Sequence, residues 1–436
     1  MRTLKGQRWR NWSHTVENKP DQIFYPTSLE ELSTIVKEAK EYKKTIRVAG
    51  AGHSFTSLLK TNEWIISLDS LSGIESLNKE KSTVTVLGGT RLYTIGKELG
   101  KRGYSQENLG DINVQSIAGA LSTGTHGTGL QFGNLSTQVI ELTLLTANGE
   151  CLTLSAYKQP HFFQASLVSL GCLGIIVKVT LKIIEAPIYI YQCKKVNYDQ
   201  LIQKLDAYIL NNRHFEFYLF PYSNTVQVKK MNETNQRPQG LKKQQLKNLI
   251  LENYFFLLLS KICKWFPKSS RYISRLSAWG VGTASITSYS YRLFATPRLV
   301  RFREMEYCIP LFSLKIALEE VRAYMEQKGY HVHFPIECRT VKEDDIWLSP
   351  SYQRDSAYIA FHMYKGMPYH DYFRDMEEIM KKYEGRPHWG KLHNLSFKEL
   401  QLLYPKFNDF LEVRKKLDPE GMFLNAYTKN LFGIME

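Results

Sequence analysis

A run of small and hydroxylated residues at positions 115–129 (QSIAGALSTGTHGTG) is the sequence feature that most limits what this chain can form. Nearly every side chain from Ala118 to Gly129 is small or carries a hydroxyl. Such a run lets the backbone approach a ligand closely, and its hydroxyls and amides add hydrogen-bond donors. A structural loop rarely needs so many glycines and hydroxyls together. The run therefore predicts a segment that wraps around a ligand.

A second glycine-rich motif, residues 48–55 (VAGAGHSF), follows a predicted strand at residues 45–49. No Gly-Lys-Thr follows it, and it does not open a helix as GxGxxG does in dinucleotide-binding folds. Taken alone, it could be an ordinary turn after a strand. This motif lies about sixty residues before the run at 115–129. Two separate glycine-rich segments suit a long cofactor better than a single phosphate group, because each can hold a different part of it.

The order of predicted elements indicates two main parts. Leu32, Ile35 and Val36 recur at helical spacing, so residues 29–44 are predicted as a helix that Thr27 or Ser28 can cap. The other expected elements before residue 186 are strands at 64–68, 83–88, 139–146 and 174–184 and a helix at 90–101. Beyond this point aromatic and basic residues increase, and longer strands are expected at 214–221 and 224–230. The chain is therefore predicted to be α+β with a domain boundary near residue 186.

Composition and charge restrict the function. The net charge is +15, but the basic residues are scattered and no nucleic-acid-binding motif accompanies them, so nucleic-acid binding is not expected. The six cysteines show neither disulfide nor zinc-ligand spacing and are expected to be buried thiols, and no metal site is expected. The N-terminus carries no apolar signal segment, which favours the cytoplasm.

One apolar segment, residues 246–266, allows two interpretations. Lys247, Glu252, Lys261 and Lys264 interrupt it, so a helix that crosses a membrane is disfavoured. An amphipathic helix fits better, and it could pack on the protein or lie on a membrane surface. Its basic flanks keep a peripheral membrane contact open. The preceding stretch from Asn232 to Gly240 is polar and is expected to be a loop.

The two glycine motifs together resemble the FAD-binding domain of the vanillyl-alcohol oxidase superfamily, which has the PCMH-type fold. Within it, the likeness is to the sugar-lactone and alditol oxidase group, which includes L-gulonolactone oxidase, D-arabinono-1,4-lactone oxidase and alditol oxidase. The likeness runs from Asn11-Trp12 through residues 171–176 to residues 385–393 and 407–427. The His-Trp-Gly-Lys element at 388–391 is its most specific part.

The resemblance implies a two-subdomain FAD-binding domain at residues 1–186. It also implies an α+β substrate or cap domain with an antiparallel sheet at residues 187–394, in which residues 232–280 form an insertion. Residues 395–436 are expected to return to the interface between FAD and substrate.

The resemblance also implies the cofactor contacts. His53 occupies the loop position at which some family members bond covalently to the flavin 8α-methyl group, whereas a loop histidine that only hydrogen-bonds backbone remains the alternative. Such a bond withdraws electron density from the flavin and favours hydride acceptance. The other expected FAD contacts are Ala49, Gly50, Ala51, Gly52, Ser54, Phe55, Ser116, Gly119, Ser122, Thr123, Gly124, His126, Gly127, Gly174, Ile175, Ile176 and Asn425.

Three charged residues match the family's catalytic positions, namely Glu337, Arg339 and Lys391. Glu337 and Arg339 stand two apart on a predicted strand and would share one face, although an ordinary exposed ion pair would show the same spacing. Lys391 would polarise or help to deprotonate the substrate hydroxyl, and Arg339 would supply positive charge near the alkoxide. Ser116 and His388 are expected to join these three in substrate binding.

These residues predict an FAD-dependent oxidoreductase that oxidises a CH–OH group of a sugar lactone, alditol or related polyol, with O2 or another acceptor reoxidising the flavin. Bacterial alditol oxidases carry His-Phe-Thr-Trp where this chain has His362-Met-Tyr-Lys, so a linear polyol is less expected. Two alternatives stay open: a membrane-surface flavoprotein that acts on a lipid-linked or anionic sugar, and a flavin-binding protein without turnover.

Overall fold

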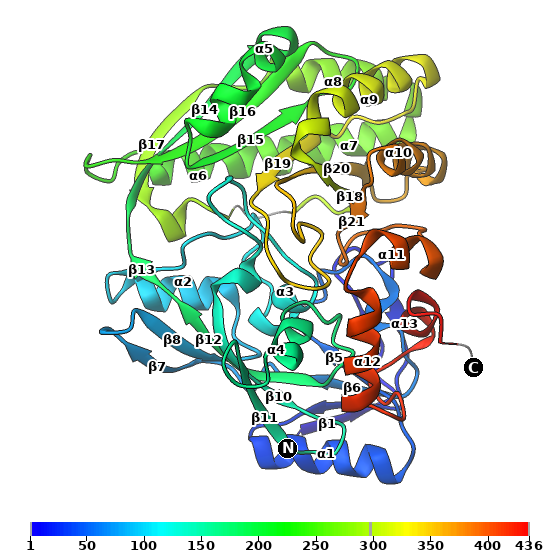
Figure 1. The fold of residues 1–436 in the computed structure, drawn as a ribbon. Coiled ribbons are helices and arrows are strands. Elements are labelled where there is room, and N and C mark those ends of the chain that lie inside the picture. Colours follow the sequence, from blue (N-terminus) through cyan, green and yellow to red (C-terminus); the bar gives the residue numbers. More distant parts are fainter. Residues whose placement is uncertain (1, 296–298, 435–436) are drawn as a thin grey trace.

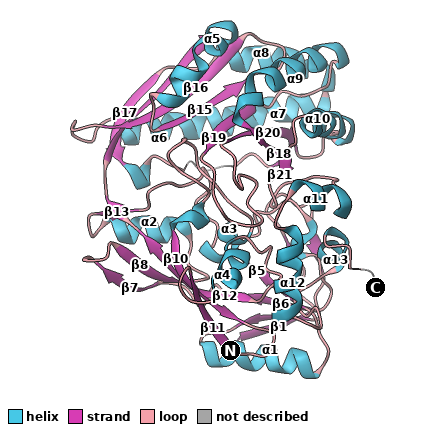
Figure 2. Cartoon of the chain, in the orientation of Figure 1, coloured by secondary structure: helices cyan, strands magenta, loops and turns pink. Residues whose placement is uncertain are grey.

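The computed structural model describes residues 2–295 and 299–434. Figure 1 shows two stacked parts, a lower one that holds the blue and cyan N-terminal segments and an upper one that is mainly green to orange. The red C-terminal helices return to the side of the lower part. Figure 2 shows that much of the chain between the lower and upper strands is loop.

The first sheet of the lower part has the order β1-β4-β6-β5. Both β4 and β5 run parallel to β6, and β1 is antiparallel to β4. Its strands are β1 (Arg2–Lys5), β4 (Gln22–Tyr25), β5 (Ile46–Ala49) and β6 (Trp64–Ser67), and a small hairpin of β2 (Trp9–Arg10) and β3 (Glu17–Asn18) lies outside it.

Helix α1 (Leu29–Glu41) confirms the predicted helix and its cap. Ser28 Oγ accepts the backbone N–H of Glu31, and Leu32, Ile35 and Val36 are buried. The helix ends before the expected residue 44 because Lys43 adopts a positive φ of 50°, which breaks the helical path.

The second sheet of the lower part is antiparallel with the order β11-β10-β12-β8-β7. Its strands are β7 (Ile74–Asn78), β8 (Thr83–Leu87), β10 (Val139–Leu145), β11 (Cys151–Ser155) and β12 (Ile175–Lys182). The helices α2 (Leu92–Gly100), α3 (Ile117–Ser122) and α4 (Pro160–Leu167) accompany it, and β9 (Tyr104–Ser105) pairs with β13 (Ile184–Glu185). The two sheets confirm the expected two-subdomain arrangement, and α3 shows that part of the 115–129 run is helical.

The upper part is built on one antiparallel sheet with the order β17-β14-β16-β15-β19-β20-β18-β21. Its strands are β14 (Ile188–Asn197), β15 (His214–Leu219), β16 (Thr225–Glu233), β17 (Ala284–Tyr289), β18 (Phe302–Pro310), β19 (Ile336–Val341), β20 (Ser356–Tyr364) and β21 (Arg386–Pro387). Three helices of this part are α5 (Tyr198–Leu210), α9 (Leu314–Lys328) and α10 (His370–Lys382). The antiparallel sheet confirms the fold expected for this half of the chain.

The polar loop expected at residues 232–240 starts later than predicted. Strand β16 extends to Glu233 because its pairing with β14 continues to Tyr189↔Glu233. Backbone pairing with a long neighbour therefore outweighs the polar composition of these residues.

The apolar segment forms helices, as predicted, but not one regular helix. It runs through α6 (Leu241–Asn248), a π-helical stretch (Leu249–Phe255) and α7 (Phe256–Trp265), and α8 (Ser270–Trp279) follows. Among the residues described, none of the helices has the length and apolarity needed to cross a bilayer.

The C-terminal segment closes over the first sheet. It contains α11 (Phe397–Leu403), α12 (Phe407–Leu417) and α13 (Ala426–Leu431). The backbone N–H of Ile46 donates to the carbonyl of Met422 at 2.8 Å, and the Asn425 amide donates to the carbonyls of Ser57, Leu58 and Lys60. These bonds tie the chain end to the segment that follows the first glycine motif.

The prediction of buried thiols is wrong for one cysteine. Cys151 is exposed because it opens β11 at the edge of the second sheet, whereas the other five cysteines are buried. All six are free thiols.

Arg47 is the buried cation that holds these segments together. Its guanidinium donates to the carbonyls of Leu58 (2.7 Å), Leu170 (2.9 Å) and Phe423. We expect Arg47→Leu to lower the free energy of unfolding by about 3 kcal/mol, because it removes several buried charge-assisted hydrogen bonds at once. Denaturant unfolding measures this, and Arg237→Leu in the exposed polar loop is the control. An equal, small effect of both substitutions would contradict the assignment.

Candidate active site

The two glycine motifs meet in one groove of about 110 Å³, although sequence alone left the first as a possible plain turn. Gly50 lies so close to the second motif that a Cβ atom would stand 2.3 Å from Ser116 Oγ. Gly52 has a φ of +67°, which glycine adopts without strain. The predicted residues that line the groove are Ala49, Gly50, Ala51, Gly52, His53, Ser54, Ser116, Gly119, Ser122, Thr123, Gly174, Ile175 and Ile176.

A larger cavity of about 450 Å³ continues from this groove. The groove and the cavity share His53, Ser54, Gln115 and Thr123 in their linings. The cavity also contains the predicted residues Phe55, His126, Glu337, Arg339, His388 and Lys391. A long ligand in the groove would therefore end at a chamber that can admit a second molecule.

His53 lies at the junction of groove and cavity. Its ring stacks on Trp12 with a centroid separation of 5.3 Å. Burial, helped by the positive charges of Lys391 and Arg91, lowers the pKa of His53 to about 4. The imidazole is therefore neutral at physiological pH and keeps a lone pair, which a bond to an electrophilic carbon requires.

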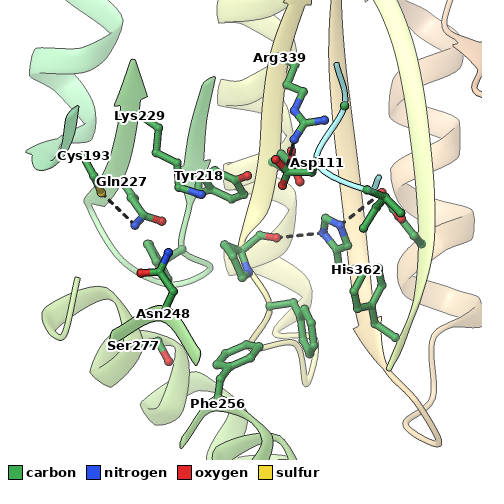
Figure 3. A pocket seen from close by; sticks show the side chains of 18 of the residues that line it. Asp111, Cys193, Tyr218, Gln227, Lys229, Asn248, Phe256, Ser277, Arg339 and His362 are labelled. Atoms are coloured by element: carbon green, nitrogen blue, oxygen red, sulfur yellow. Dashed lines mark hydrogen bonds and ion pairs between the residues drawn. The ribbon is translucent and has the colours of Figure 1, made fainter. Parts of the chain in front are cut away.

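Arg339 and Glu337 point from β19 into the cavity, as their spacing predicted. Arg339 forms ion pairs with Glu337, with Glu216 (3.0 Å) on the adjacent strand β15 and with Asp111 (3.2 Å) from a loop of the lower part. Figure 3 shows the Arg339 side chain directed toward Asp111. Burial raises the pKa of Glu337; Arg339 opposes this shift, and the carboxylates of Asp111 and Glu216 add to it. The pair is buried, so the alternative of an exposed ion pair is excluded.

Lys391 is positioned by strand β18. The backbone N–H groups of His388 and Leu392 donate to the carbonyls of Glu306 (3.0 Å) and Glu304 (2.9 Å), so this segment runs along the strand. The Lys391 ammonium pairs with Glu304 and lies 4.0 Å from Glu306. Burial alone would raise the pKa of Glu304, but Lys391 and His362 bring it down to about 2. Two carboxylates therefore fix the position of the Lys391 side chain in the cavity.

His362 stands between these charged groups. Its Nδ1 lies 3.2 Å from the Pro335 carbonyl, and its Nε2 lies 3.4 Å from Glu304 (Figure 3). The buried His362 is the residue that this chain shares with the alditol-oxidase element, and the departure from that pattern lies in the three residues that follow it.

His126, Glu306 and His388 form a buried cluster whose potential ligand atoms lie within 4.8 Å of one another. His126 Nδ1 lies 2.9 Å from the Gly127 carbonyl, and its Nε2 lies 3.3 Å from Glu306. His388 Nδ1 accepts the Gly390 N–H, so the proton of the neutral ring is on Nε2. Burial lowers the pKa of His388 to about 3, which keeps the ring neutral.

Some predicted contacts lie elsewhere. Ser116 lines the groove but not the larger cavity, and its Oγ accepts the Gly119 N–H as the cap of α3. Gly124, Gly127 and Asn425 line neither space. Gly127 packs against the Asn108 side chain, and Asn425 holds the C-terminal segment in place.

Sequence reasoning missed four acidic residues of the site, Asp111, Glu216, Glu304 and Glu306. A signal was present for two of them, because Glu304 and Glu306 alternate with apolar residues along a strand and so face one side. Asp111 and Glu216 carried no such signal, since only folding brings their segments to Arg339.

Fold and groove together define an FAD-binding oxidoreductase of the PCMH type. The model described as "FAD binding domain" matches residues 20–155, and the crystal structure of cholesterol oxidase from Brevibacterium sterolicum has the same fold, with a TM-score of 0.81 at 17% identity over 99% of this chain and 97% of that one. The narrow glycine-lined groove, which added side chains would fill, fits the extended cofactor.

The chain belongs to the D-arabinono-1,4-lactone oxidase family, whose model matches residues 179–431. It is 37% identical to L-gulono-1,4-lactone dehydrogenase of Mycobacterium tuberculosis over 98% of this chain and 99% of that protein. It is 35% identical to L-gulonolactone oxidase of Bos taurus with the same coverage. The comparisons give no support to a lipid-linked substrate or to a flavin-binding protein without turnover.

The charge balance around Lys391 predicts a pH-dependent stability. In the wild type, the pKa of Glu304 falls from its usual 4.5 to about 2, so its stabilising contribution is complete above pH 4.5 and is lost as the pH falls toward 2. Lys391→Met leaves Glu304 buried without this cation, which raises its pKa. We expect the variant to lose about 3 kcal/mol at pH 7 and to approach the wild type in acid.

Urea unfolding of the holoprotein across this pH range measures the difference. Lys391→Arg is the control, because it keeps the positive charge and should keep most of the stability. A stability difference that is independent of pH would contradict the pairing.

Proposed function

We propose that this protein oxidises a CH–OH group of a sugar lactone or a closely related polyol. The observation that carries the proposal is the cavity in which the cofactor groove meets two paired cations, the half-buried Lys391 and the buried Arg339. The names of its relatives, L-gulonolactone oxidase and L-gulono-1,4-lactone dehydrogenase, support lactones as the substrate class. FAD, when bound, supplies the hydride acceptor for this reaction.

The protein's own residues supply the charge and proton chemistry. Lys391, held as an ammonium ion by Glu304, donates a hydrogen bond to the substrate oxygen and stabilises the developing alkoxide. Arg339, on strand β19, adds a second fixed positive charge to the cavity. Glu337, whose pKa burial raises, orients a hydroxyl and can accept its proton. His388, which keeps its Nε2 proton, contributes a neutral donor to substrate binding, and Ser116 acts from the cofactor side.

Anaerobic mixing of the holoprotein with L-gulono-1,4-lactone, D-arabinono-1,4-lactone and linear alditols tests this function by the bleaching of the flavin absorbance. We expect the lactones to reduce the flavin fastest. Lys391→Ala should slow the reduction by about 10²-fold or more, because the alkoxide loses its donor. Lys398→Ala, an exposed lysine on α11, is the matched control. Unchanged reduction in Lys391→Ala would refute the catalytic assignment.

O2 or another acceptor is proposed to reoxidise the reduced flavin. The relatives carry both the name oxidase and the name dehydrogenase, so the family includes both behaviours. Admitting air to the reduced holoprotein distinguishes them, because only an oxidase regains its yellow colour rapidly.

We propose that His53 bonds covalently to the flavin. Its neutral ring and its place at the junction of groove and cavity support this. Acid precipitation should then leave the yellow colour with the wild-type protein and release it from His53→Ala. Ser54→Ala is the matched control and should keep the colour in the pellet. Free flavin in the wild-type supernatant would leave His53 as a non-covalent contact.

We also propose that the protein is cytoplasmic and contacts a membrane surface peripherally through residues 246–266. Several apolar side chains of this segment are exposed, among them Leu246, Ile250 and Tyr254, while Leu259 and Cys263 anchor it to the protein.

A further inference from the structure

Exposed apolar side chains are concentrated in one short stretch of the chain. Among the residues that the structure describes, more than half of the large apolar side chains with high exposure lie between Leu246 and Trp279. We call this surface the insertion face; it comprises Leu246, Leu249, Ile250, Leu251, Tyr254, Phe255, Leu258, Trp265, Phe266, Tyr272, Leu276 and Trp279. Exposed apolar side chains scattered singly need no explanation, whereas their concentration in one segment indicates an interaction site.

The same segment is strongly basic. Residues 241–282 contain eight lysines and arginines and a single acidic residue, Glu252. They therefore carry close to half of the net charge of +15. Basic side chains beside exposed apolar ones attract anionic lipid headgroups while the apolar side chains enter the lipid boundary.

The insertion face also borders the active-site cavity. Leu251, Phe255, Leu276 and Trp279 are exposed and at the same time line the cavity. In Figure 3, Asn248, Phe256 and Ser277 of the insertion stand opposite Gln227 and Lys229 of β16. The cavity that reaches Lys391 therefore opens through this face.

The helices of the insertion are fixed to the protein so that they can lie along a surface. In α7, Leu259, Ser260 and Cys263 are buried, and Ser260 Oγ lies 2.9 Å from His333 Nε2. Leu258 and Trp265 on the same helix are exposed. This division is the pattern of an interfacial helix, which rests in the plane of the bilayer.

We propose that the insertion face docks the protein on an anionic phospholipid bilayer, with the mouth of the active-site cavity at the lipid surface. The docking itself is argued from exposure and charge, and only the identity of the molecule that enters the cavity rests on the proposed function. A second copy of the chain is the weaker occupant, because two such basic faces would repel each other. An anionic surface instead complements the charge.

Co-sedimentation of the flavin-loaded protein with vesicles tests the docking. The two probes are vesicles of phosphatidylcholine alone and vesicles of phosphatidylcholine mixed with phosphatidylglycerol. We expect binding to the mixed vesicles, little binding to the neutral ones, and release from the mixed vesicles at high salt. Equal binding to both, or to neither, overturns the proposal.

Variants locate the contact. Trp265→Ser with Phe266→Ser, which lie outside the cavity lining, should weaken binding to the mixed vesicles by about tenfold or more. The matched control is Tyr157→Ser with Phe312→Ser, two exposed aromatic residues elsewhere, which should bind as the wild type does. Equal weakening in both double variants would contradict the assigned face. Lys242→Gln with Lys243→Gln should weaken binding at low salt more than Lys79→Gln with Lys81→Gln does.

Two further measurements separate the possible failures. In the absence of vesicles, lactones should reduce the flavin equally fast in every variant of this set. If the protein binds vesicles but none of the lactones reduces its flavin, only the proposed function is refuted. The protein could instead form a concentration-dependent dimer that the double variant Trp265→Ser with Phe266→Ser abolishes. This result would assign the insertion face to a second copy of the chain and overturn the proposal of bilayer docking.

Discussion

One backbone hydrogen bond joins the two halves of the site. The N–H of Phe55, at the end of the first glycine motif, donates to the carbonyl of Gly390 at 2.7 Å. Gly390 lies within the segment that runs along β18 and carries Lys391, so this contact brings the His53 loop and the lysine to one cavity. The hydroxyls of Ser54 and Thr56 donate to the carbonyls of Gly390 and Trp389, both at 3.4 Å, so they support the same junction between cofactor groove and cationic site.

More than one carboxylate pairs with each of two cations that line the cavity, Arg339 and Lys391. Arg339 meets Glu337, Glu216 and Asp111, and Lys391 meets Glu304 and Glu306. Burying charges costs free energy unless they are paired, so each cluster of carboxylates fixes its cation in one place. A rigid, charged donor that needs no rearrangement is what a developing alkoxide requires.

Much of the fold could be predicted from local patterns. The helix at 29–41 and its Ser28 cap, three strands of the second sheet (β8, β10 and β12) and the strand that carries Glu337 and Arg339 follow from periodicity and capping, whereas β7 and β11 were not predicted. The errors occurred where tertiary contacts outweigh local preference. Strand β16 continues into polar residues because β14 pairs with it, and Cys151 is exposed because its strand lies at a sheet edge.

The two glycine motifs by themselves indicated a long ligand, because close backbone approach needs small residues whatever surrounds them, and the family resemblance identified that ligand as FAD. It also determined that Glu337 and Arg339 share a face, since side chains alternate along any strand. Only the tertiary structure decided which carboxylates meet Arg339 and Lys391, and that the basic, apolar insertion borders the cavity mouth. Those contacts join residues far apart in the chain, and their energies depend on distance and burial, which no local pattern encodes.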